Sequence, residues 1–260
     1  MIRHHLLRSK NTFMPRSTPF SGLLFHMGMN KTGSTFLQHA VFPQLLGISG
    51  YKKDSISAIQ TEVALRQKKR SEQRILSREG LAGKAEARDP GSTWSDFERT
   101  LELIRPIKSQ VSVLVFFRPQ FEYVTSCYWH LVKKNLFKGS FEGYLEHFNE
   151  RDLSWADRVT YLKEFRSLIF FHSELRQDPE QVIAVIRAEL GLPGDFQIER
   201  REAVNLSAST KAQLRAAQWM SKALFTPVLH KFRQISGLGR VFQSSENMQH
   251  VVLDSCIRAH

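Results

Sequence analysis

Short runs of apolar residues, separated by longer stretches with helical spacing, set the pattern of this chain. The clearest run spans residues 111–117, where β-branched and aromatic residues follow one another almost without a polar break. Further strand candidates lie at residues 23–27, 74–79 and 167–171. Buried parallel strands are typically apolar in this way, because both faces of the sheet are covered. The pattern predicts an α/β fold with a central parallel sheet of about four or five strands flanked by helices in three layers.

The composition suits one globular core, with 42% apolar and 24% charged residues in a chain of 260. We expect residues 21–210 to form a single α/β domain. Residues 1–20 carry Lys and Arg but no acidic residue, which predicts a disordered basic tail. Residues 211–260 have amphipathic spacing, which predicts a helical C-terminal extension packed on the same domain.

The formal net charge of +12 predicts a polyanionic partner. A nucleotide, an acidic surface and nucleic acid are the alternatives that this charge leaves open. From residue 210 onward there are seven Lys or Arg against two Asp or Glu. That basic segment could hold an acidic acceptor, contact a membrane surface or simply be solvated.

Cysteine usage and hydropathy bear on the compartment. The two cysteines, Cys127 and Cys256, provide neither a disulfide framework nor a metal site by themselves. The N-terminal residues lack a secretory apolar region, and no stretch reaches the roughly 18 apolar residues of a membrane span. We therefore expect a cytoplasmic protein, and the sequence offers no carboxylate cluster with metal-ligand spacing.

Residues 28–35 combine features of an anion-binding loop. An apolar run breaks at Gly28, and Lys31, Gly33 and three hydroxyl residues precede renewed apolar spacing. This order predicts a buried strand, a tight loop and a helix that starts near Gly33. The N–H groups of Gly33, Ser34 and Thr35 would be unpaired donors of the first helical turn, and the Lys31 ammonium would add charge. We expect a phosphate or sulfate here.

The nucleotide-binding P-loop, G-x-x-x-x-G-K-[ST], is the obvious comparison. Gly28 and Gly33 have its spacing, but Ser34 stands where that motif has lysine. The order Lys31-Thr32-Gly33-Ser34-Thr35-Phe36 instead resembles the 5′-phosphosulfate loop of the PAPS-dependent sulfotransferases, P-K-[ST]-G-[ST]-T-[WSF]. The departure is Asn30, where that family often has proline.

A second signature in the expected order strengthens the resemblance. Arg118 directly follows the strand at 111–117, and Ser126 lies eight residues later. In the sulfotransferases an arginine and a serine so spaced grip the 3′-phosphate of the nucleotide. The resemblance covers roughly residues 21–210. It implies a P-loop-like fold, PAPS as co-substrate, 3′,5′-ADP as product, no required metal, and a soluble, bacterial-type member of the family.

The resemblance also implies roles for single residues. Lys31 would be catalytic, neutralising charge on the leaving 5′-phosphate, and Glu79 would be the general base. The expected cofactor-binding residues are Lys31, Thr32, Gly33, Ser34, Thr35, Phe36, Arg118, Ser126 and Arg201. Phe36 stands where the family often has an aromatic residue near the adenine, although it suits the helix core equally well. Arg201 opens a weaker match, at residues 200–207, to a segment that returns toward the 3′-phosphate.

Two further residues are assigned structural roles. His26 lies inside an apolar run, which favours a core histidine. Glu174 follows the strand at 167–171 after His172, which replaces a tyrosine of the family pattern, and we expect Glu174 to pair with backbone or a base.

The sequence thus predicts transfer of a sulfuryl group from PAPS to a hydroxyl acceptor on a carbohydrate or glycoconjugate. A nucleotide-dependent phosphotransferase is the enzymatic alternative, although the lysine is displaced and no strand ends in a convincing Walker-B aspartate. A basic nucleic-acid-binding protein is the other alternative. It has the charge in its favour but no recognised motif, so we expect no nucleic-acid partner.

Overall fold

A parallel β-sheet forms the centre of the molecule in a computed structural model that describes residues 22–47, 54–69, 74–84 and 89–192. The described strands are β1 (Leu23–Gly28), β2 (Ile75–Glu79), β3 (Val111–Phe117) and β4 (Arg166–Phe171). Their spatial order is β2-β1-β3-β4, and each neighbouring pair is parallel. The predicted α/β class with a parallel sheet of about four or five strands is confirmed, and the described residues form four of them.

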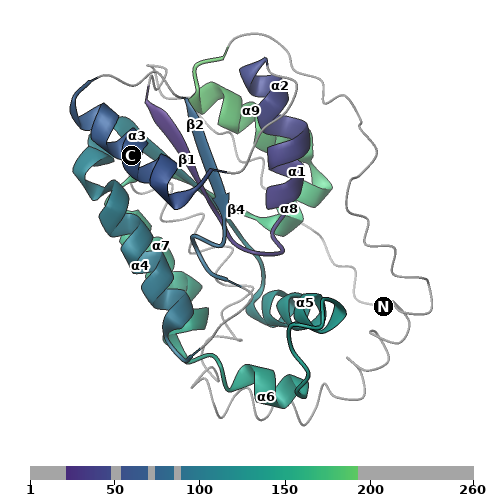
Figure 1. Cartoon of the computed structure of the whole chain (residues 1–260). Helices are drawn as coiled ribbons and strands as arrows, with labels where there is room; N and C mark the ends of the chain where they lie inside the picture. The colour runs from purple at the N-terminus through teal and green to yellow at the C-terminus, as the bar shows by residue number, and fades with distance from the viewer. Residues whose placement is uncertain (1–21, 48–53, 70–73, 85–88, 193–260) are drawn as a thin grey trace, which may run out of the picture.

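Helices connect the strands and cover both faces of the sheet (Figure 1). The first helical run is unbroken and consists of α1 (Ser34–Phe36), a π-helical turn η1 (Leu37–Val41) and α2 (Phe42–Leu46). The others are α3 (Ile56–Gln67), α4 (Ser92–Ile104), η2 (Arg105–Gln110), α5 (Gln120–Lys133), α6 (Phe141–Leu145), η3 (Arg151–Leu153), α7 (Trp155–Leu162), α8 (His172–Gln177) and α9 (Pro179–Glu189). None of these helices is long and apolar enough to cross a membrane.

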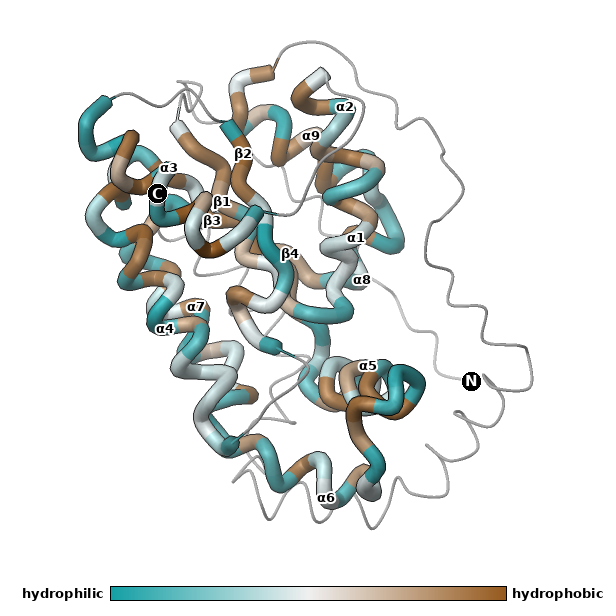
Figure 2. Tube along the Cα trace, viewed as in Figure 1, coloured by the Kyte–Doolittle hydropathy of each residue, from teal (hydrophilic) through white to brown (hydrophobic). Residues whose placement is uncertain are grey.

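Alternating side chains of the strands build two separate cores. Phe25, Val113 and Val115 belong to the core under α3, α4, α5 and α7, whereas Leu24 and Leu114 belong to the core under η1, α2 and α9. Figure 1 shows α3, α4 and α7 on one side of the sheet and α1, α2, α8 and α9 on the other. The apolar residues of the strands lie between these layers (Figure 2). The predicted tail at 1–20 and extension at 211–260 lie outside the described residues.

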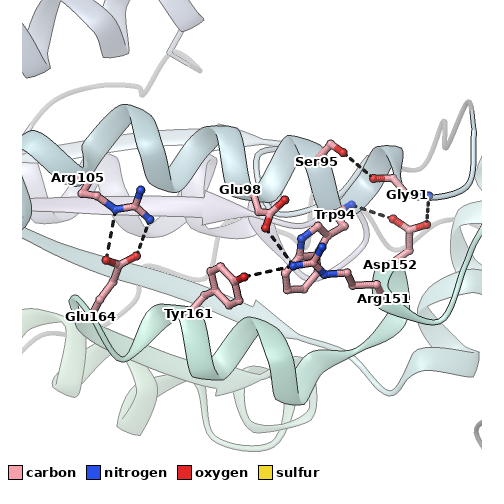
Figure 3. A network of polar contacts seen from close by, with 9 residues as sticks. All are labelled: Gly91, Trp94, Ser95, Glu98, Arg105, Arg151, Asp152, Tyr161 and Glu164. Carbon is pink, nitrogen blue, oxygen red and sulfur yellow. Dashed lines mark hydrogen bonds and ion pairs between the residues drawn. The ribbon is translucent and has the colours of Figure 1, made fainter.

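A buried polar network joins α4 to the segment before α7 (Figure 3). The carboxylate of Asp152 accepts hydrogen bonds from the N–H groups of Gly91 (2.6 Å), Trp94 (2.8 Å) and Asn149 (3.0 Å). Asp152 is fully buried, so these three donors replace the water that the charge has lost. Two partly exposed ion pairs lie nearby: Arg151–Glu98 joins η3 to α4, and Arg105–Glu164 joins η2 to the residues that follow α7.

Arg158 extends this network into the core. Its guanidinium donates to the carbonyl oxygens of Ala82 (3.1 Å) and Asp152 (2.8 Å). It lies over the rings of Trp94 and Trp155, at 5.3 and 5.4 Å from their centroids. Burial lowers the pKa of this guanidinium to about 10, which still leaves it charged at neutral pH. Its charge is therefore held by carbonyl dipoles and aromatic faces.

His26 is a core residue of β1, as its apolar surroundings predicted. Its Nδ1 lies 2.7 Å from the hydroxyl oxygen of Ser77, which also accepts a hydrogen bond from the Gln38 amide at 2.9 Å. The rings of Phe42 and Phe116 meet the imidazole edge to face. Complete burial lowers the pKa of His26 from 6.5 to about 3. The neutral imidazole is therefore the folded form at physiological pH.

This pKa predicts that acidification destabilises the fold through His26. As the pH falls through 6.5, the unfolded chain binds a proton that the folded imidazole does not bind until about pH 3. The free energy of unfolding should lose about 1.4 kcal/mol through this residue between about pH 7.5 and 5.5. His26→Gln should remove that part of the pH dependence in urea unfolding. The exposed His39 lies on the first helical run, and His39→Gln serves as the matched control. Equal pH dependence in wild type and His26→Gln would contradict the prediction.

Candidate functional site

The loop between β1 and the first helical run has the conformation that the sequence predicted. The helix begins at Ser34, and Gly33 caps it with a φ of 95° that glycine adopts without strain. Gly28 allows β1 to lie close to its surroundings, because a Cβ atom there would be 2.7 Å from the Ser34 hydroxyl and 3.0 Å from the Glu79 Cα. Lys31 has a φ of 64°, which L-residues rarely adopt. Such strain is typical of functional loops.

Two of the loop hydroxyls point inward. Thr32 and Ser34 are buried, and both donate hydrogen bonds to the carbonyl oxygen of Met29, at 2.9 and 3.2 Å. In this structure they shape the loop. Thr35 is half-buried. Leu37 donates to the Gly33 carbonyl, so the N–H groups of Ser34 and Thr35 precede the helix's own hydrogen bonds and suit an anion.

Arg118 brings the second sequence signature to the loop. It follows β3 directly, and its Nη1 donates to the carbonyl oxygen of Lys31 at 3.2 Å across a separation of 87 residues. Its Nε is paired with the carboxylate of Glu122 at 3.2 Å. Ser126 lies further along α5 and is half-buried. Parallel strands deliver their carboxyl ends to one edge of the sheet, and that geometry brings the two signatures together.

Glu79 lies beside the start of the loop. It is the last residue of β2, it is opposite Gly28 in the register of the sheet, and it is half-buried. The neighbouring N–H of Gly80 donates to the Gly28 carbonyl at 2.6 Å. The guanidinium of Arg78 is held by the carbonyl oxygen of Asp54 at 2.9 Å. The position of Glu79 suits the predicted general base, and the role itself stays a prediction.

Charges from three elements converge on α5. Burial raises the pKa of the Cys127 thiol to about 12, while the charges of Lys31 and Arg118 lower it and that of Glu79 raises it. The loop, the residue after β3 and the end of β2 each contribute one of these charges. The thiol itself stays protonated at neutral pH, so it is a core group and not a nucleophile.

His172 is a site neighbour to which the sequence assigned no role. It opens α8 directly after β4, and its ring is 3.7 Å from where a Cβ of Gly33 would lie. Partial burial, together with the charges of Arg118 and Arg176, lowers the pKa of His172 from 6.5 to about 4. A neutral imidazole therefore faces the loop. Its position at the carboxyl end of a strand was the one available signal.

The remaining candidates divide into three groups. Phe36 is half-buried and packs against the core under η1 and α9, which favours the alternative of a core residue. The Glu174 carboxylate accepts a hydrogen bond from the Phe171 N–H, a structural role as predicted. Arg201 lies outside the described residues. Within the described part of the chain, no group of three His, Cys, Asp or Glu residues could hold a metal ion.

Comparisons with known proteins identify similarity at the level of structure. No protein-family model matches the sequence, and no curated protein matches it. A sulfotransferase from Alicyclobacillus acidocaldarius is similar over 85% of this chain and 96% of its own, with 18% identity and a TM-score of 0.43. The mouse sulfotransferase SULT7A1, complexed with PAP, is similar over 68% of this chain and 61% of its own, with 16% identity and a TM-score of 0.41.

Identities and TM-scores this low carry no argument about the substrate or about the roles of single residues. Both similar structures are sulfotransferases.

Proposed function

We propose that this protein transfers a sulfuryl group from PAPS to a hydroxyl acceptor, on a carbohydrate or glycoconjugate and in the cytoplasm. The observation that carries the proposal is the contact of Arg118 Nη1 with the Lys31 carbonyl, at 3.2 Å. This contact brings the guanidinium of Arg118 to the loop, for which we infer anion binding. A nucleotide with two separate phosphates on one ribose suits such a pair of sites.

The residues present fit this nucleotide. Backbone N–H groups at the start of the helix and the Lys31 ammonium suit a 5′-phosphate. The planar guanidinium of Arg118 can bind a second phosphate through two parallel hydrogen bonds, and the Ser126 hydroxyl can add one more. Arg118 is only 20% exposed, so little water competes for its hydrogen bonds.

The chain's own groups would divide the work of the reaction. PAPS supplies the sulfuryl group when bound. Lys31 and the loop N–H groups stabilise charge that grows on the phosphate side, as oxyanion donors do elsewhere. Glu79, at the same edge of the sheet, accepts the proton of the acceptor hydroxyl. His172 adds an imidazole beside the loop. Because this imidazole is neutral, it adds no positive charge to the site.

The phosphotransferase alternative has less support from the site. Ser34 occupies the position of the P-loop lysine, and its hydroxyl is turned to the Met29 carbonyl inside the loop. Arg118 directly follows β3, at a place where a Mg²⁺-dependent enzyme would need a carboxylate. An arginine at this place suits a bound phosphate better than a divalent cation.

The first prediction concerns nucleotide specificity. 3′,5′-ADP should bind without Mg²⁺, and ADP, which lacks the 3′-phosphate, should bind roughly ten- to a hundredfold more weakly. The reason is the loss of a charge-assisted bidentate contact with Arg118, worth about 1.5–3 kcal/mol. Isothermal titration calorimetry with both nucleotides, with and without Mg²⁺, measures this. Equal affinities, or a strict need for Mg²⁺, would favour the phosphotransferase.

The second prediction concerns the general base. Glu79→Gln keeps the size of the side chain but cannot take up the proton, so sulfation should fall by about a hundredfold or more. Binding of 3′,5′-ADP should persist, and the pH–rate profile should lose its acidic limb. Steady-state sulfation across pH, with a confirmed acceptor, provides the measurement.

A matched control is Glu102→Gln, since Glu102 is exposed on α4, and its turnover should equal that of wild type. Near-normal turnover in Glu79→Gln would transfer the role to another group, with His172 the first to test. Loss of nucleotide binding in Glu79→Gln would show instead that the residue is structural.

A further inference from the structure

The structure assigns a positioning role to Trp155, a residue far from the loop in sequence. The indole Nε1–H of Trp155 donates to the carbonyl oxygen of Arg118 at 2.7 Å. We propose that this hydrogen bond fixes the backbone from which Arg118 reaches the 3′-phosphate, and so contributes to selection of a 3′-phosphorylated nucleotide. The inference rests on the proposed function and extends it to a residue that contacts no nucleotide.

The Arg118 carbonyl lies where the sheet stops providing partners. The register between β3 and β4 ends at the pair Phe117–Phe171, so Arg118 is one residue beyond the ladder. Pro119 follows and has no N–H of its own. An indole N–H at 2.7 Å satisfies this carbonyl and holds the peptide plane at the turn into α5.

Trp155 is itself held on several sides, which makes it a suitable anchor. It is 2% exposed, and its ring stacks on Phe117 with a centroid distance of 5.5 Å and an interplanar angle of 22°. Tyr123 meets it edge to face at 5.5 Å, and the Arg158 guanidinium lies over it at 5.4 Å. Asp152 and Arg158 in turn connect this cluster to α4.

The position of the Arg118 backbone matters because its guanidinium contacts partners on two different elements. Nη1 reaches the Lys31 carbonyl and Nε pairs with Glu122. Bidentate binding of a phosphate needs the guanidinium plane at one orientation. If this backbone could move, the guanidinium of Arg118 would keep its charge but lose the orientation that bidentate binding requires. Loss of the Trp155 hydrogen bond should therefore weaken binding of the 3′-phosphate and leave binding of the 5′-phosphate at the loop unchanged.

Trp94 provides a matched control in the same cluster. It is also 2% exposed, and Arg158 lies over its ring at 5.3 Å. Its indole nitrogen, however, is buried without a hydrogen-bond partner. Trp94→Phe therefore removes a similar volume from the same core while leaving the Arg118 carbonyl satisfied.

The experiment compares Kd values of 3′,5′-ADP and ADP by calorimetry for wild type, Trp155→Phe and Trp94→Phe. In Trp155→Phe the preference for 3′,5′-ADP should fall by about three- to tenfold, the usual worth of one hydrogen bond, with the Kd of ADP unchanged. Both variants should lose thermal stability because each leaves a cavity. Trp94→Phe should keep the wild-type preference.

The outcomes separate this inference from the proposed function. A preference in Trp155→Phe equal to that of wild type, or an equal fall in Trp94→Phe, would overturn the positioning role alone. A wild type that does not distinguish the nucleotides would overturn both.

If Trp155→Phe fails to fold, the calorimetry is replaced by NMR of the indole N–H groups in the wild-type protein. Substitution of the other tryptophans assigns the Trp155 signal. The Trp155 signal should shift and gain protection from hydrogen exchange with 3′,5′-ADP but not with ADP. An identical response to both nucleotides would contradict the role.

Discussion

The hydrogen bond from the Arg118 guanidinium to the Lys31 carbonyl is the contact on which the site depends. It joins the loop after β1 to the end of β3. Lys31 needs such support, because its φ of 64° costs about 1–2 kcal/mol relative to ordinary helical or extended backbone. The same contact brings the guanidinium of Arg118 to the backbone of Lys31, while the carboxylate of Glu122 pairs with its Nε.

The rest of the fold serves to hold these two groups. Parallel pairing of β1 with β2 and β3 aligns Gly28, Glu79 and Arg118 at one edge of the sheet. Two cores fix the strands from both faces, and His26 contributes to one of them as a neutral core group. On the other face, Asp152 and Arg158 connect α4 and α7 around Trp155. The cluster around Trp155 thus contributes both to the stability of the fold and to the orientation of the Arg118 guanidinium.

The strands, the loop after β1 and the cation after β3 could be predicted from the sequence, because each depends on neighbouring residues in the chain. Apolar runs predicted the strands, and Gly28 and Gly33 predicted the loop. The position of Arg118 directly after an apolar strand predicted it as a cation of the site. The inward turn of the Thr32 and Ser34 hydroxyls could not be predicted, since it depends on where the Met29 carbonyl points. The position of His172 next to Gly33 and the hydrogen bond of Trp155 to Arg118 also arise only when distant elements pack. The role predicted for Arg201 remains a prediction, because the residue lies outside those that the structure describes.

The central claim is that the Lys31 loop and Arg118 bind two phosphates of one nucleotide. A crystal structure of the protein grown with 3′,5′-ADP and without divalent metal tests it most directly. The account predicts the 5′-phosphate at the N–H groups of Ser34 and Thr35 with the Lys31 ammonium beside it. It also predicts the 3′-phosphate on the guanidinium of Arg118, with Glu122 displaced from Nε. A nucleotide bound with its 3′-phosphate in solvent, or bound away from the loop, would contradict the account.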